Sequence, residues 1–118
     1  MSRITNEFHA IEFMTAAYLE TAAWADSEAE VGAFVEFTKS AQIQARKECV
    51  AFLEQAMDHG IGSDLAPAVM GHNFWLSRNG HGTGFIDSDS RHAVALQALA
   101  AAAGTRELEF SRGKLRFF

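Results

Sequence analysis

Several features that would place a small protein in a class are missing from this chain of 118 residues. Its single cysteine, Cys49, cannot form an internal disulfide, and its position in an apolar helical repeat predicts a buried small hydrophobe rather than a nucleophile. No apolar run approaches the roughly 18 residues that cross a bilayer, and Glu7 and Glu12 interrupt the N-terminus where a signal peptide would be apolar. We therefore expect a cytoplasmic protein with no membrane partner.

Positive charge is also scarce. Ten Lys and Arg residues against fifteen Asp and Glu residues give a formal net charge of −5, which argues against general attraction to a phosphate backbone. An acidic surface suits a basic protein surface, such as one that normally holds nucleic acid. The acidic residues that we expect on such a surface are Glu28, Glu30, Glu36, Asp87 and Asp89.

At this length the chain is expected to form one domain. It divides into a helical half at residues 1–60, a connector at 61–71 that holds the only proline, and a second half at 72–118. Apolar side chains recur at helical spacing from Ile4 to Trp24, which predicts the first helix.

Two capping patterns compete for the start of the second helix. Ser27 and Glu30 match a capping box, in which each side chain accepts from a free backbone N–H. Alternatively, Thr38 caps a separate helix that starts at Lys39. We favour this alternative, with a break in the helix between Phe37 and Ser40. Gly60 is placed to end the helix.

The connector is expected to hold at most a short helical turn, capped by Ser63 or Asp64. Further along, Ser88 or Ser90 is a candidate cap for another helix, which Gly104 would end.

Apolar and polar residues then alternate in "ELEFSRGKLRFF", which predicts a C-terminal hairpin with a two-residue turn at Arg112 and Gly113. The expected cross-strand pairs are Phe110 with Leu115, Leu108 with Phe117, and Glu109 with Arg116.

The central stretch "GHNFWLSRNGHGTGF", residues 71–85, combines histidines, glycines and aromatic residues. Asn79-Gly80 is typical of a type I′ turn and predicts a β-hairpin, with Trp75 lying over bare glycine backbone on one face. The expected pairs on the other face are Arg78 with His81, Leu76 with Thr83, Phe74 with Phe85, and His72 with Asp87.

These elements predict an α+β fold. The helical N-terminal half would pack on a small antiparallel sheet built from the two hairpins, with one intervening helix on a face of that sheet. An exposed edge of the sheet would allow a homodimer.

The polar residues of the central hairpin suggest two kinds of binding. Arg78, Asn79 and His81 at its tip are candidates for specific contacts with a protein partner. Alternatively, Trp75 and the neighbouring aromatic residues could stack nucleic-acid bases while Arg78 and His81 engage phosphate.

A metal-dependent enzyme is the third alternative. The candidate ligands for a divalent ion are His72, His81, Asp87 and Asp89, but a hairpin would hold the two histidines roughly 20–30 Å apart. His72 oriented by Asp87 could also act as a general base, although no nucleophile faces it. We therefore expect no metal, no cofactor and no catalysis.

Three stretches, "YLETAAW", "ARKECVAFLEQA" and "GHNFWLSRNGHGTGF", resemble a widespread family of small phage and prophage proteins of unknown function. The hallmark of that family reads approximately GHDFWLTRNGHGxGFWD. Three departures matter: Asn73 for Asp and Ile86 for Trp within this hallmark, and Glu48 for the Asp of an Asp-Cys-x-x-Phe helix that precedes it. Asn73 removes a carboxylate beside His72, which weakens a metal or acid–base site there.

The resemblance implies a phage or mobile-element origin. Together with the acidic charge, that origin leads us to expect an anti-defence protein, similar in action to an anti-CRISPR, that binds and inhibits a host defence complex without catalysis. The alternative is a phage accessory protein that binds nucleic acid directly.

Overall fold

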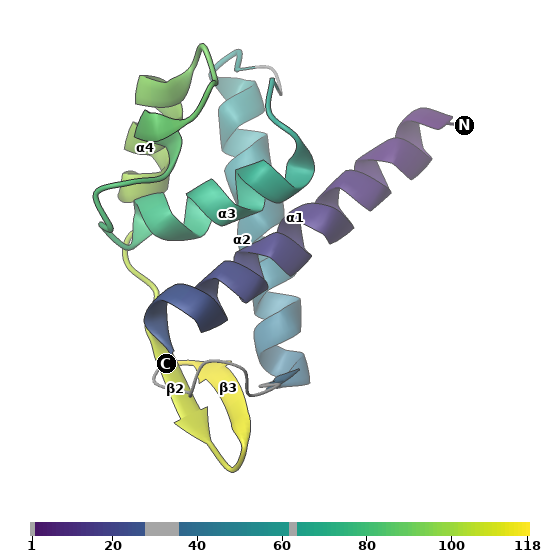
Figure 1. The fold of residues 1–118 in the computed structure, drawn as a ribbon. Helices are drawn as coiled ribbons and strands as arrows, with labels where there is room; N and C mark the ends of the chain where they lie inside the picture. The colour runs from purple at the N-terminus through teal and green to yellow at the C-terminus, as the bar shows by residue number, and fades with distance from the viewer. Residues whose placement is uncertain (1, 28–35, 62–63) are drawn as a thin grey trace.

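The computed structural model describes the backbone of residues 2–27, 36–61 and 64–118, and the side chains of these residues from Ala10 onward. Within these ranges, helices combine with a small three-stranded sheet, which confirms the α+β class (Figure 1). The helices are α1 (Ser2–Asp26), α2 (Lys39–Asp58), α3 (Pro67–Arg78) and α4 (Ala93–Ala102), with a 3-10 turn η1 (Phe85–Asp87). The strands are β1 (Glu36–Phe37), β2 (Leu108–Ser111) and β3 (Lys114–Phe117).

The boundaries in the N-terminal half follow the capping signals. The break before α2 is confirmed, because the Thr38 hydroxyl accepts from the N–H of Ala41 at 3.1 Å. Gly60 ends this helix with a φ of +72°, as predicted. The alternative capping box of Ser27 and Glu30 cannot be placed, since Glu30 lies outside the described residues.

The central hairpin prediction is wrong, because residues 67–78 form the helix α3. The Asn79-Gly80 pair ends this helix instead of turning between strands. Gly80 has a φ of +69°, its N–H donates to the Ser77 carbonyl, and the N–H of His81 donates to the Leu76 carbonyl. These two bonds form a Schellman motif, which needs the positive φ at glycine that a type I′ turn also needs.

The connector is shorter than predicted. Pro67 begins α3, where its missing N–H costs no helical hydrogen bond. Asp64 starts no helix; it accepts from the Ser90 hydroxyl at 2.7 Å and from the N–H of Arg91 at 2.8 Å. Ser90 in turn orders the residues before α4 by accepting from the N–H of His92, which is the cap residue of that helix.

The C-terminal hairpin is confirmed with every predicted cross-strand pair. Arg112 and Gly113 form its turn, with φ values of +53° and +79°. The sheet is not the predicted pair of hairpins: its order is β1-β3-β2, and β1 lies parallel to β3 with Phe37 opposite Leu115.

The core lies where α1, α2 and α3 cross. Phe74 is central to it, with ring centroids 4.2 Å from Phe52 and 5.1 Å from Tyr18. Gly71 lets α3 approach α1, because a Cβ at this position would overlap the backbone carbonyl of Met14. From this crossing the N-terminal part of α1 extends past the other two helices (Figure 1).

Candidate functional site

Arg78, predicted at an exposed hairpin tip, is only 8% exposed at the end of α3. Its Nη1 donates to the Tyr18 hydroxyl and to Glu48 Oε1, both at 2.8 Å. Its Nε and Nη2 donate to the carbonyl oxygens of Gly104 and Ala103, which follow α4. Arg78 therefore joins α3 to α1, α2 and the end of α4, and it is not free to contact a partner in this structure.

Glu48 is the centre of this buried polar group. Besides Arg78 and Tyr18, its carboxylate accepts from Gln44 and Arg106. Burial opposes ionisation, but the hydrogen bonds from Arg106, Tyr18 and Gln44 and the charge of Arg78 outweigh it, so the pKa of Glu48 lies below its ordinary value. We call these five residues the ion cluster.

Three other motif residues fasten the end of α3. Trp75 is fully buried, and its indole N–H donates to Asp26 at the end of α1. His81 Nε2 lies 2.8 Å from the same carboxylate. The Asn79 side chain donates to the Trp75 carbonyl and accepts from the N–H of Arg106. The nucleic-acid mechanism that needed an exposed Trp75 is therefore not available in this conformation.

His72 is exposed on α3, and its Nδ1 lies 2.9 Å from the Thr21 hydroxyl. Its ring lies beside that of Trp24, which is 73% exposed, with the centroids 6.4 Å apart. The predicted cross-strand pairing with Asp87 is wrong because the strands that would create it do not form. Asp87 is exposed on η1.

The acidic candidates are only partly described. Glu36 is exposed on β1, where its Cα partner is Lys114, and Asp89 is exposed just after η1. Glu28 and Glu30 lie outside the described residues. The described acidic candidates thus lie at two separate places, on the edge strand β1 and before α4.

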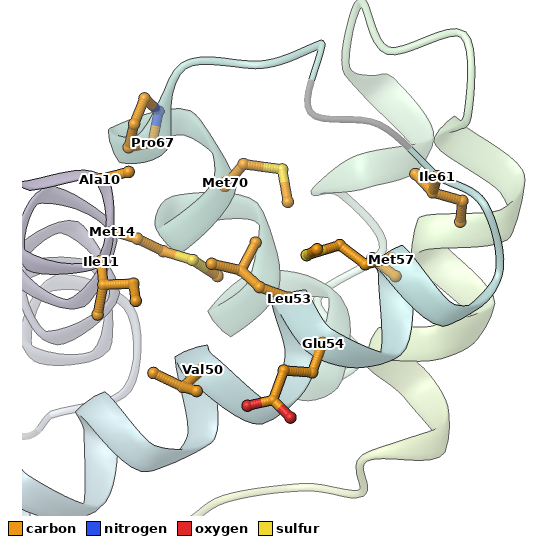
Figure 2. Close-up of a pocket in the computed structure, with 11 residues that line it drawn as sticks. Ala10, Ile11, Met14, Val50, Leu53, Glu54, Met57, Ile61, Pro67 and Met70 are labelled. Atoms are coloured by element: carbon orange, nitrogen blue, oxygen red, sulfur yellow. The ribbon is translucent and has the colours of Figure 1, made fainter. Parts of the chain in front are cut away.

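An apolar groove of about 350 Å³ lies between α1, α2 and α3 (Figure 2). Three of the four methionines of the chain line it, and Glu54 is the one charged side chain among the lining residues that the structure describes. Figure 2 shows that the side chains converge on this space from all three helices. The lining residues are Ala10, Ile11, Met14, Val50, Leu53, Glu54, Ala56, Met57, Ile61, Pro67 and Met70.

The sequence did not indicate this groove. Its helical spacing extends one apolar face of α2 as far as Met57, which suggests that Leu53 and Met57 belong to the core. The structure leaves Leu53 partly buried and Met57 71% exposed. The one sequence feature that could have indicated the groove is the length of the apolar stripe on α2, which extends beyond the part that the neighbouring helices cover.

A second, more polar cleft of about 790 Å³ lies between the start of α2 and the C-terminal hairpin. The Arg106 guanidinium lies over the Phe117 ring, 4.9 Å from its centroid, and Arg116 pairs with Glu109 at 3.0 Å. Phe118 at its edge is 79% exposed. This cleft combines cations with aromatic surface, unlike the groove.

Among the described residues, no three His, Cys, Asp or Glu side chains gather in a way that could hold a metal ion. No helix in the described ranges has the length and apolar character needed to cross a bilayer. Comparisons with protein-family models, curated proteins and solved structures found no match. A functional proposal therefore depends on the contacts, burial and charge of this chain's own residues.

Proposed function

We propose that this chain is a non-catalytic protein of phage or mobile-element origin that binds and inhibits a host defence complex. The observation that carries the proposal is the apolar groove between three helices, in which Met57 is 71% exposed beside the buried Met14 and Met70. Apolar surface rimmed by polar residues is typical of protein–protein contact sites. The resemblance of the sequence to phage and prophage proteins supplies the biological setting.

The charge of the chain supports a basic partner. With a net charge of −5 and exposed acids such as Glu36, Asp58, Asp87 and Asp89, it would be attracted to surfaces that normally hold nucleic acid. Such attraction acts mainly between exposed groups, so it weakens as salt is added.

The polar residues of the central motif support inhibition without turnover. Arg78, Asn79 and His81 are engaged in contacts that hold helices together. Cys49 is fully buried, and this burial raises its pKa to about 12, which leaves its thiol protonated at neutral pH.

The proposal is tested in bacterial strains that each carry one defence system, including several CRISPR types. Expression of the chain should restore plating of a targeted phage in at least one strain, relative to the empty vector. Unchanged plating in every strain would contradict the anti-defence role.

A second candidate function, direct binding of single-stranded nucleic acid, is favoured by the polar cleft rather than by the central motif. Arg116 and Phe118, which are exposed at this cleft, offer the cation and ring surfaces that such binding uses. A labelled oligonucleotide should then bind in a salt-dependent manner, and Arg116→Ala should weaken it. Absence of binding at low salt would remove this candidate.

A further inference from the structure

We infer that the apolar groove receives an amphipathic helix of the partner protein that carries basic residues beside its apolar face. This inference rests on the proposed function for the existence of a protein partner. It adds where that partner binds and which chemistry the groove selects.

The groove is a consequence of how the helices cross. Gly71 brings α3 against the backbone of α1 at Met14 and Tyr18. Tyr18 is fixed in turn by its hydrogen bond to Glu48 on α2 and by stacking on Phe74 of α3. Because α1 continues past this contact toward its N-terminus, its backbone extends beyond α2 and α3 (Figure 1). The walls are thus anchored to the core, and the space between them stays open.

The lining suits apolar side chains of varied shape. Met57 contributes an exposed, flexible thioether, which adapts to an apolar ligand, and the buried Met14 and Met70 line the groove beside Leu53 (Figure 2). The volume of about 350 Å³ is near the lower limit of the roughly 300–1,000 Å³ of ligand pockets, so it suits a few large side chains. An amphipathic helix supplies such side chains at positions i, i+3, i+4 and i+7.

The charge at the groove selects a basic helix. Glu54 lines it, and the exposed Asp58, which is adjacent to the lining residue Met57, lies one helical turn further along α2. A fatty acid or an anionic membrane is a less suitable ligand, because it would place negative charge beside the carboxylate of Glu54. A second copy of this chain would add another net charge of −5, which also opposes association.

The test uses a labelled helical peptide with leucine at i, i+3, i+4 and i+7 and lysine at the flanking positions. Fluorescence anisotropy should show binding to the full chain, and the same peptide with glutamate in place of lysine should bind at least about tenfold more weakly. Met57→Gln should weaken the lysine peptide by about tenfold, because it removes exposed apolar surface from the groove. Ile43→Gln is the matched control, since Ile43 is 58% exposed on α2 outside the groove.

A second pair of variants isolates the charge. Glu54→Gln should reduce the preference for the lysine peptide over the glutamate peptide. Glu20→Gln changes the net charge equally on the exposed surface of α1, outside the groove, and should leave that preference unchanged. Urea unfolding of each variant separates loss of binding from loss of folding.

Absence of binding at peptide concentrations of about 1 mM, or equal affinity for wild type and Met57→Gln, would overturn the inference. A wild-type dimer in sedimentation experiments that Met57→Gln abolishes would overturn it too, by assigning the groove to a second copy.

Capture of host proteins distinguishes failure of this inference from failure of the proposed function. If Met57→Gln captures the same host protein as wild type, the groove inference fails while the proposed function stands. If the lysine peptide occupies the groove but no host protein is captured, the proposed function fails and the groove chemistry stands.

Discussion

Glu48 on α2 connects three other parts of the chain, and nothing in the neighbouring sequence indicates this role. Its carboxylate accepts from Tyr18 on α1, from Arg78 on α3 and from Arg106 before β2. The sequence placed Arg78 at a binding surface because Asn79-Gly80 was interpreted as a hairpin turn with Arg78 at its tip. The structure uses the charge internally, since a buried guanidinium needs an anion and several acceptors.

Removing the anion should be costly. We expect Glu48→Gln to lower the free energy of unfolding by about 3 kcal/mol or more, because it leaves the buried Arg78 without a counter-charge. Glu12→Gln, which breaks the exposed pair with Arg46, should cost only about 0–1 kcal/mol. Urea unfolding near neutral pH measures both, and equal losses would contradict the structural role of the ion cluster.

The same residue predicts a pH dependence. Because the folded-state pKa of Glu48 lies below its ordinary value of 4.5, the unfolded chain binds the proton more readily. The stabilisation by Glu48 is therefore complete above pH 4.5 and is lost as the pH falls through the folded-state pKa. The difference in unfolding free energy between wild type and Glu48→Gln should shrink on acidification below that pH. A difference that is equal at about pH 7 and about pH 3 would show that the carboxylate is not preferentially ionised in the folded state.

At the scale of elements, the patterns that depend on near neighbours predicted well. The first helix, the Thr38 cap and the C-terminal hairpin each follow from a few adjacent residues. The central motif failed because α3 is buried on most of its circumference, so that residues 73–78 show no 3.6-residue alternation. The parallel strand β1 could not be predicted, since its two residues pair with a strand far along the chain.

Gly71 within α3 and Gly80 just after its end should respond differently to alanine. Gly71→Ala places a methyl group against the Met14 carbonyl and should lower the unfolding free energy by about 3 kcal/mol. Gly80→Ala meets no atom and strains only a positive φ, at about 1 kcal/mol. Chemical denaturation compares them. Equal losses would mean that the close approach of α1 and α3 does not depend on Gly71.

The C-terminal turn offers a stabilising change. Arg112 has a positive φ of 53°, which asparagine tolerates better than arginine. Arg112→Asn should therefore raise the unfolding free energy by up to about 1 kcal/mol. Thermal unfolding is the measurement, with Lys114→Asn as a strand control that should not stabilise. A destabilised Arg112→Asn protein would indicate that the arginine side chain has a further role.

At the scale of the whole molecule, the sequence predicted the net negative charge but not the apolar groove. Net charge and exposed acids follow from composition. The groove depends on where α1 crosses α2 and α3, which is decided by contacts between residues distant in sequence, such as Gly71 with Met14. Nothing local distinguishes the exposed Met57 from the buried Met70. Trp75, Arg78 and Asn79, which the sequence indicated as binding residues, thus build the fold, whereas the surface proposed for binding depends on how the helices cross.

The most direct test of the account is to measure which host proteins co-purify with tagged wild type, Met57→Gln and Ile43→Gln at low and high salt. We predict one enriched host protein complex that wild type and Ile43→Gln retain, that Met57→Gln loses, and that high salt releases. Recovery of nucleic acid alone, or of no specific protein with wild type at low salt, would contradict the claim that this chain acts by binding a basic protein partner.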